Sequence, residues 1–339
     1  MKIILDAMGG DNAPNAAVEG AVAAASDSCR VLLVGDENRI NQILAGRKTE
    51  YIEVIHASQV IDMHDKPSTA VRVKKDSSMA VALRLLNEGT GDALVSAGST
   101  GALLTGATLV TGRIKGIRRP ALAPLLPQKT GGYTLLIDSG ANAVCTPENL
   151  LQFAYMGYFF MKTQQDISAP RIGLLNNGTE EGKGDELRQE AYALLKTAGD
   201  SGRIRFVGNV EARDALMGVC DVLVCDGFSG NVLLKSIEGA AAFIMDELRQ
   251  TLMAGTVSKL AAAALRPGLR EMKHKLDYKE VGGAPFLGVS RPVIKAHGSS
   301  DARAFERAIG QAFVFSGCDF IQQVSENVEY MTEQKANEE

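Results

Sequence analysis

The stretch Arg171–Leu187, R-I-G-L-L-N-N-G-T-E-E-G-K-G-D-E-L, predicts a strand, a glycine-rich loop and the start of a helix. Its first part, 172–175, is a short apolar run of the kind that forms a buried strand. Three glycines within the seven residues 178–184 follow, and glycine adopts backbone conformations that other residues avoid. Asp185 then stands where a helix N-cap is expected. Such a loop presents backbone N–H groups to an anion, and Lys183 adds a mobile positive charge.

This glycine loop is not a Walker A motif, which requires G-x-x-x-x-G-K-[ST]. The interval from Gly178 to Gly182 is one residue short, and Gly184 stands where the metal-binding hydroxyl is needed. The alternative to an anion site, for any single loop of this kind, is a loop that only connects a strand to a helix.

The composition is that of an ordinary soluble globular protein. The chain has 339 residues, 45% hydrophobic and 22% charged, enough for one large domain or two modest ones. Its net charge of −4 argues against a nucleic-acid-binding protein, because those usually carry a basic face. Five cysteines without paired spacing indicate a reducing compartment, and no apolar run reaches the ~18 residues of a membrane span. We therefore expect a cytoplasmic protein.

Apolar strands alternate with amphipathic helices along the chain. This alternation predicts an α/β fold with a mostly parallel sheet and helices on both faces. A helical tract over about 232–276, interrupted near Gly255 and at Pro267-Gly268, is expected to form a long extension. No change of composition marks a linker. We therefore expect one catalytic domain over 1–330, with two lobes as the alternative, and a flexible tail over 331–339.

Five predicted strands end in small or polar loops that contain glycine. Because the carboxyl ends of parallel strands face one edge of a sheet, we expect these loops to line one crevice. Short side chains and free backbone N–H groups suit a phosphate. The strands end at Leu5, Val95, Ile137, Leu175 and Val224, and the candidate contacts are Gly9, Gly10, Asp11, Ser99, Thr100, Gly101, Asn142, Asn177, Gly178, Thr179, Gly230 and Asn231.

Other chemistries fit the sequence less well. It has no G-x-G-x-x-G after a strand, no G-x-S-x-G, and neither H-E-x-x-H nor paired C-x-x-C for zinc. Cys145 could be a nucleophile, but a small buried cysteine is the favoured interpretation. Acidic residues at 6, 11, 138 and 226 are interpreted as loop anchors or helix caps, with metal binding as a weaker alternative. Without a convincing side-chain nucleophile, we expect the bound anion itself to attack.

Ordered motifs extend along almost the whole chain. They include L-D-A-M-G-G-D at 5–11, V-S-A-G-S-T-G-A-L at 95–103, G-L-L-N-N-G-T-E-E-G-K-G at 173–184, D-G-F-S-G-N at 226–231 and K-A-H-G-S-S at 295–300. Together they resemble the bacterial phosphate acyltransferases of the PlsX family. The chain departs from the family pattern at Ser99, where the family more often has Asn, and at Ser139. Each departure keeps a polar or small residue.

The resemblance implies a three-layer, Rossmann-like fold of the isopropylmalate-dehydrogenase type. It implies reversible acyl transfer from acyl carrier protein to inorganic phosphate, giving acyl phosphate for phospholipid synthesis, without a cofactor or metal. It also implies a homodimer at the membrane surface, where the partner would be the membrane acyl-phosphate:glycerol-3-phosphate acyltransferase. Phosphate is already partly dianionic near neutrality, so it needs no strong base to attack a thioester.

Within that reaction, we expect Lys183 to neutralise the phosphate, with hydrogen bonds from Asn177, Gly178 and Thr179. A solvated loop lysine is the alternative. The neighbouring carboxylates at 180 and 181 would repel the anion, so they should point away or orient the lysine.

Asn231, together with the N–H of Gly230, is the candidate donor to the tetrahedral oxyanion, and a helix N-cap is the alternative. His297 could donate to the phosphate or protonate the leaving thiolate, with Ser299 beside it, or it could be structural.

Two surface features bear on partners. A basic group before 120 could receive an acidic carrier protein, although a charge run is usually a solvated face. Apolar and basic residues mixed within the helical extension predict a membrane-surface or dimer-forming element. The basic group is Arg113, Lys115, Arg118 and Arg119, and the apolar positions are Leu252, Leu260 and Leu265.

Three other functions remain open at this point. A phosphotransacylase that uses coenzyme A would need a similar crevice, and so would a decarboxylating dehydrogenase of related fold with NAD and a divalent metal. A carrier-protein-binding regulator recruited to membranes is the alternative without catalysis.

Overall fold

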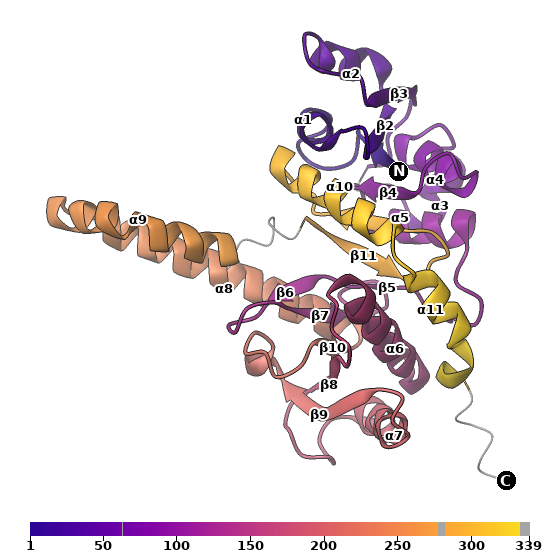
Figure 1. Ribbon diagram of the computed structural model, residues 1–339, viewed down its shortest axis with the longest axis vertical. Helices are drawn as coiled ribbons and strands as arrows, with labels where there is room; N and C mark the ends of the chain where they lie inside the picture. The colour runs from indigo at the N-terminus through magenta and orange to yellow at the C-terminus, as the bar shows by residue number, and fades with distance from the viewer. Residues whose placement is uncertain (63, 277–281, 333–339) are drawn as a thin grey trace.

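A computed structural model of the chain describes residues 1–62, 64–276 and 282–332. Its strands form two mostly parallel sheets, where the sequence predicted one, and helices cover both faces of each sheet (Figure 1). The α/β class and the Rossmann-like layering are confirmed.

The first sheet has seven strands in the order β3-β2-β1-β4-β12-β11-β5. Its parallel part is β3 (Ile52–His56), β2 (Arg30–Gly35), β1 (Lys2–Asp6), β4 (Ala93–Ser96) and β12 (Val293–Ala296). The last two strands, β11 (Gly283–Leu287) and β5 (Ala121–Leu122), run antiparallel to their neighbours. Alternate side chains of a strand face opposite sides of the sheet, and along β1 Ile3 and Leu5 join one buried cluster while Ile4 joins another.

The second sheet has five strands in the order β6-β7-β10-β8-β9. They are β6 (Leu125–Pro127), β7 (Tyr133–Ile137), β10 (Val222–Val224), β8 (Arg171–Asn176) and β9 (Arg205–Glu211), and only β6 runs antiparallel to its neighbour. The stretch that predicted a strand, a loop and a helix forms β8 and, after the N-cap Asp185, helix α7 (Glu186–Asp200).

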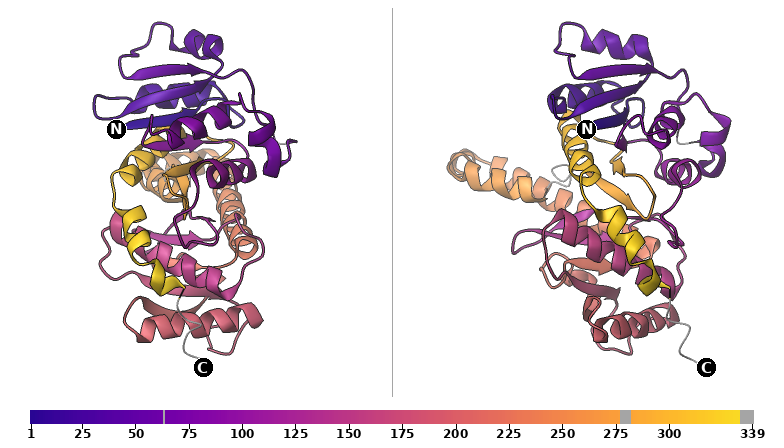
Figure 2. Two further views of the ribbon diagram at one scale, coloured as in Figure 1. Left: turned by 90° about the vertical axis from the view of Figure 1, so that its right-hand side faces the viewer. Right: turned by 45° about the vertical axis from the view of Figure 1, so that its right-hand side comes forward.

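Helices bury the faces of both sheets. On the first sheet, α1 (Asn15–Ala24), α2 (Glu37–Leu44) and α10 (Ala302–Ser316) pack on one face, and α3 (Pro67–Val73), α4 (Ser78–Asn87) and α5 (Thr100–Gly106) pack on the other. On the second sheet, α6 (Pro147–Gln164) and α7 share one face, and the first turns of α8 (Gly227–Met253) cover the other. Helix α11 (Phe320–Glu326) lies against α6 (Figure 2).

One hydrophobic cluster continues from one sheet to the other. Phe160 of α6 meets Phe315 of α10 edge to face, with ring centroids 5.7 Å apart. The backbone also joins the sheets, because the N–H of Leu122 in β5 donates to the carboxylate of Asp138, which follows β7, at 2.9 Å. The two sheets are therefore held together by packing and by hydrogen bonds at this junction.

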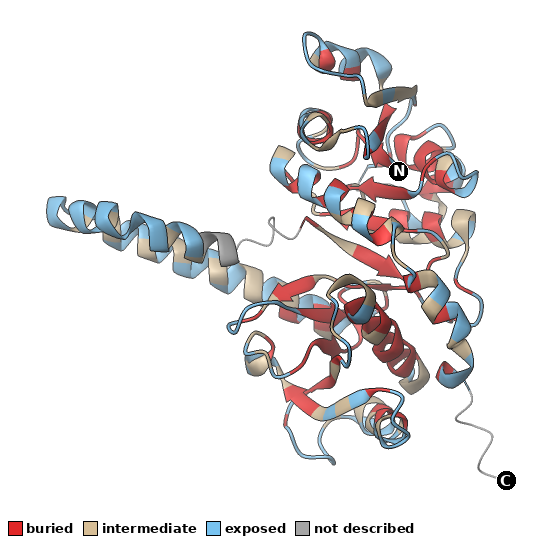
Figure 3. Ribbon diagram, in the orientation of Figure 1, coloured by how far each residue is buried: buried red, intermediate tan, exposed pale blue. Residues whose placement is uncertain are grey.

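The helical extension is a hairpin of α8 and α9 (Thr256–Leu276) that projects from the body (Figure 1). It begins at Gly227, five residues before the predicted start, because the side chain of Asp226 caps the helix by accepting from the N–H of Ser229. The predicted break at Gly255 is confirmed. The break at Pro267 is wrong, since α9 continues through it alongside α8. Most residues of the hairpin are exposed (Figure 3).

The predicted start of the tail at residue 331 is wrong. Met331 is only 1% exposed and ends a 3-10 turn, Val328–Met331, that contacts α6. The rest of the predicted tail, 333–339, lies outside the described residues.

Two glycines of α8 provide a matched stability test. A Cβ at Gly230 would overlap the carbonyl oxygen of Asp138, whereas nothing lies within 4 Å of a Cβ at Gly239. We expect Gly230→Ala to lower the free energy of unfolding by about 1–3 kcal/mol through overpacking. We expect Gly239→Ala to raise it by up to ~1 kcal/mol through helix propensity. Urea unfolding of both variants measures the two effects, and equal stability would contradict the close contact at Gly230.

Candidate functional site

A cavity of about 770 Å³ opens between walls that come from both sheets. Loops after β1, β4 and β12 form one side, and β6, the loop after β7 and the first turns of α8 form the other. This volume is within the range of sites for small molecules and cofactors. Several predicted site residues line it, namely Gly10, Asp11, Ser99, Thr100, Asn231 and His297.

A polar centre of three basic side chains lies in this cavity: Lys235 of α8, Lys295 of β12 and His297. The ammonium of Lys235 is 3.3 Å from Nε2 of His297. Nδ1 lies 2.9 Å from the hydroxyl of Ser299 and accepts from the backbone N–H of Ser299 at 3.2 Å. Burial and the charge of Lys235 lower the pKa of His297, so the ring is neutral near pH 7. A neutral imidazole can take up a proton, although the adjacent ammonium makes that uptake less favourable.

Lys295 is a buried cation, with 9% of its surface exposed. Its ammonium donates to the carbonyl oxygens of Ala97 and Ala296. Burial lowers its pKa to about 8, while the carboxylates of Asp6 and Asp11 oppose that shift. Sequence reasoning missed both lysines of the polar centre, although Lys295 opens the motif K-A-H-G-S-S.

Asp6 is the residue that holds the loops after β1 and β4 together. Its carboxylate accepts from the hydroxyl of Ser96 at 2.7 Å and from the N–H of Met8 at 3.2 Å. Burial raises the pKa of this carboxyl. A Cβ at Gly9 would lie 2.6 Å from the backbone nitrogen of Gly98, so only glycine fits there. Asp6 is thus a loop anchor, which is one of the roles that the sequence predicted for it.

The loop after β8 contributes no residue to the cavity lining. The side-chain amide of Asn176 ties it down by donating to the carbonyl of Lys183 at 3.1 Å and to the side chain of Asn209 at 3.0 Å. Asn177, Thr179 and Lys183 are exposed, and Gly178 is buried. Glu181 pairs with Lys196 at 3.0 Å, so it points away from Lys183. The sequence predicted that all five loops line one crevice. For the loop after β8 this prediction is wrong, because that loop contributes no residue to the cavity lining.

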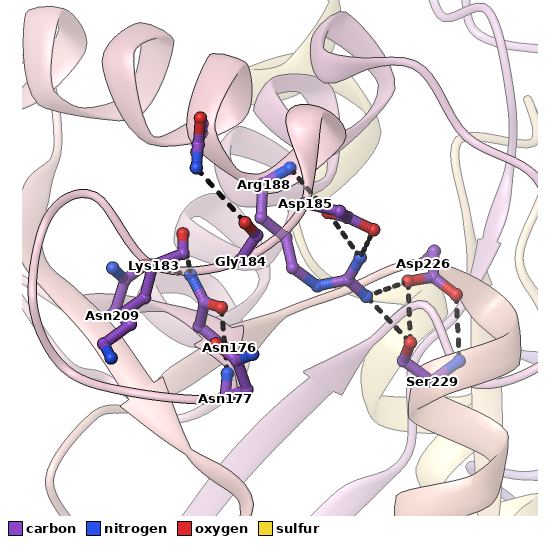
Figure 4. A network of polar contacts seen from close by, with 10 residues as sticks. Asn176, Asn177, Lys183, Gly184, Asp185, Arg188, Asn209, Asp226 and Ser229 are labelled. Atoms are coloured by element: carbon purple, nitrogen blue, oxygen red, sulfur yellow. Dashed lines mark hydrogen bonds and ion pairs between the residues drawn. The ribbon is translucent and has the colours of Figure 1, made fainter.

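Arg188 connects this loop to the start of α8 (Figure 4). Its guanidinium pairs with Asp185, the N-cap of α7, and with Asp226, the N-cap of α8. Arg188 also donates to the hydroxyl of Ser229 at 2.8 Å. The guanidinium of Arg188 therefore holds the end of the β8 loop against the start of α8, which forms part of the cavity wall.

Three expectations about individual residues need correction. The N–H of Gly230 donates to the carbonyl of Asp226 at 3.0 Å within the helix, so it is not available to an oxyanion. The backbone and side-chain N–H groups of Asn142 donate to Asp138 and Pro120, so Asn142 shapes a turn. Asn231 is not a helix cap, because Asp226 takes that position and Asn231 faces the cavity one turn later.

The remaining predicted contacts lie beside the cavity. Gly9 and Gly101 are close to the cavity but outside its lining, and Ser299 contacts the cavity through His297.

Burial and the nearby Asp138 raise the pKa of Cys145 to about 12, which leaves the thiol protonated and argues against a nucleophile. In the part of the chain that the structure describes, no group of three or more His, Cys, Asp or Glu side chains could hold a metal ion.

The two predicted partner surfaces are both exposed. Arg113, Lys115, Arg118 and Arg119 are exposed on the segment that joins the sheets, and Arg118 is 3.7 Å from Glu148. On the hairpin, Leu260 and Leu265 are 74% and 58% exposed, whereas Leu252 is half-buried between α8 and α9. Within residues 1–62, 64–276 and 282–332, no helix has both the length and the apolar character to cross a bilayer.

Comparison with known proteins places the sequence in a family. The family model described as "Fatty acid synthesis protein" matches residues 1–323. The phosphate acyltransferase of Shouchella clausii is 50% identical over 314 residues, which cover 92% of this chain and 94% of that protein. That of Alkaliphilus oremlandii is 49% identical over 331 residues, 97% of both chains. The EutD phosphotransacetylase of Staphylococcus aureus has a similar fold, with a TM-score of 0.58 at 15% identity over 95% of this chain and 94% of that one.

The buried ammonium of Lys295 predicts a pH-dependent stability. Its pKa is about 8 in the folded protein against the ordinary 10.5, so between these values the unfolded chain binds more protons at this lysine. Stability therefore rises with pH through that window, by on the order of 3 kcal/mol in all. Lys295→Met has no titrating group there. We expect the free energy of unfolding of the wild type, minus that of Lys295→Met, to increase from about pH 7.5 to about pH 9.5 in urea titrations. A difference that stays constant with pH would contradict a titrating buried ammonium.

Proposed function

The chain belongs to the phosphate acyltransferase family, and from this premise we propose that it transfers a fatty acyl group from acyl carrier protein to inorganic phosphate, reversibly. The observation that carries the proposal is the cavity, where basic side chains suited to an anion share one space with apolar walls. Acyl phosphate made in this way would feed phospholipid synthesis. No cofactor enters the reaction.

The reaction balances without a protein nucleophile. An oxygen of HPO₄²⁻ attacks the thioester carbon, and the tetrahedral oxyanion collapses with loss of the thiolate. The phosphate proton passes to the thiolate, so the products are the acyl phosphate and the free thiol. The neutral imidazole of His297 lines the cavity and can carry that proton.

Charge stabilisation comes from groups around the phosphate and the developing oxyanion. Lys235 and Lys295 line the cavity on the phosphate side. Lys183 lies outside the cavity lining, and we propose that its positive charge attracts the anion from the adjacent loop, because the loop after β8 and the start of α8 follow neighbouring strands. The side-chain amide of Asn231 is the oxyanion donor, without the N–H of Gly230.

The exposed surfaces give the proposal its partners. The basic group 113–119 would receive the acidic carrier protein, in which case added salt raises the KM for the carrier thioester. The hairpin would form a homodimer and contact the membrane from the cytoplasm, near the membrane acyl-phosphate:glycerol-3-phosphate acyltransferase. Vesicle flotation that Leu260→Glu does not reduce would contradict the membrane contact.

The decisive experiment supplies the protein with a fatty acyl carrier-protein thioester and labelled phosphate. We expect labelled acyl phosphate that hydroxylamine traps as the hydroxamate. A parallel reaction with acyl-coenzyme A identifies the thiol, since product from that donor alone would make the protein a coenzyme-A phosphotransacylase. Binding of the carrier protein without product from either donor would contradict catalysis.

Two variants separate the predicted roles of the site residues. We expect Lys183→Ala to raise the KM for phosphate with little change in kcat, because a charge outside the cavity lining attracts the anion without contacting the reacting atoms. We expect Asn231→Ala to reduce kcat by about 10²–10³, because one oxyanion donor is lost, with little change in the KM for phosphate. Ser236→Ala, exposed on α8 outside the cavity lining, is the matched control. An unchanged KM for phosphate in folded Lys183→Ala, or a loss of only a few-fold in Asn231→Ala, would remove that residue from its role.

A further inference from the structure

The cavity has an apolar wall that the polar centre does not use. Leu216, Leu234 and Ile237 pack against the buried cluster that contains Leu126, and all four residues line the cavity. Apolar residues of β5 and β6 also line the cavity, and Ile61, in the loop after β3, lines it from the side of the first sheet. The α8 side of the cavity is therefore apolar and backed by core packing.

One face of α8 carries both the polar centre and this wall. The lining positions 231, 234, 235, 238 and 241 recur at the spacing of a single helix face. Asn231 opens this face, and Ala241 ends it among the lining residues. With a rise of 1.5 Å per residue, the ten steps between them cover ~15 Å. The cavity thus runs from the catalytic end of α8 towards the hairpin.

We propose that the apolar wall along α8, from Leu234 through Ile237 to Ala241, holds the acyl chain of the thioester. The thioester carbonyl then lies at the polar centre, between Asn231 and His297. This inference rests on the proposed function and deepens it, because it assigns the acyl chain to one wall of the cavity and names the residues that set its length.

The chemistry of the wall favours the hydrocarbon chain of the acyl group over the pantetheine arm of the thioester. A pantetheine arm carries amide groups, and burying an amide without a hydrogen-bond partner is unfavourable. The side chains of Leu234, Ile237 and Ala241 offer no such partner, whereas a methylene needs none. The carboxylate of Glu238 on the same helix face is already paired with Lys235 at 2.7 Å. Each methylene buried against the wall should strengthen binding about fourfold. Specificity for chain length follows from how many methylenes the wall can cover.

Two adjacent alanines test the inference. Ala241 lines the cavity, whereas Ala240 is exposed on α8 and does not line it. We measure kcat/KM for carrier-protein thioesters of butanoyl, octanoyl, dodecanoyl and hexadecanoyl groups with the wild type, Ala241→Phe and Ala240→Phe. We expect Ala241→Phe to keep butanoyl transfer and to lose hexadecanoyl transfer by more than about tenfold, because the ring fills the far end of the wall. We expect Ala240→Phe to match the wild type at every chain length.

Other outcomes overturn the inference or the proposed function, and they differ. An equal loss at all chain lengths, no change in Ala241→Phe, or the same chain-length loss in Ala240→Phe would show that the acyl chain lies elsewhere. A wild type that forms no acyl phosphate from any thioester would contradict the proposed function itself. Should Ala241→Phe not fold, Ile237→Ala serves instead. It removes methylenes from the wall, so the gain in kcat/KM per added methylene should fall below the wild-type value, and an unchanged gain overturns the inference.

Discussion

The close contact between the first turn of α8 and the turn after β7 is the constraint on which the site depends. Gly230 has no side chain where the carbonyl of Asp138 approaches the helix, and Gly227 leaves room for Asn142 in the same way. Asp138, in turn, accepts from the N–H of Leu122 in the other sheet. The turn after β7 therefore positions the start of α8, from which Asn231 and Lys235 line the cavity. The same turn joins the two sheets through Asp138.

The polar centre places a cation where its charge is disfavoured. Lys295 donates to two backbone carbonyls and lies near the buried carboxyl of Asp6, yet burial still lowers its pKa to about 8. Ionisable groups perturbed in this way gather at functional sites more often than in structural cores. The negative charge of an incoming phosphate dianion would stabilise the ammonium of Lys295. That interaction would explain why a lysine is buried at this position.

The fold alone does not distinguish among acyl donors. The EutD phosphotransacetylase has a similar fold at 15% identity, and folds of this class carry many activities. Any preference for a donor must therefore come from local features. In this chain they are the apolar face of α8 joined to a cationic centre, the exposed basic segment and the exposed helical hairpin. The proposed donor, a long acyl chain on an acidic protein, depends on these features.

The sequence by itself determined most of the local structure and the family to which the chain belongs. The apolar run before Asn176 and the cap Asp185 predicted β8 and α7, because such signals act over a few residues. Only the tertiary structure decided that the strands divide between two sheets, that the Gly230 N–H is used within a helix, and that Lys183 lies outside the cavity while Lys295 lies inside it. These outcomes depend on contacts between residues far apart in the chain, such as Leu122 with Asp138 of the other sheet and Lys235 with His297, which no local pattern specifies.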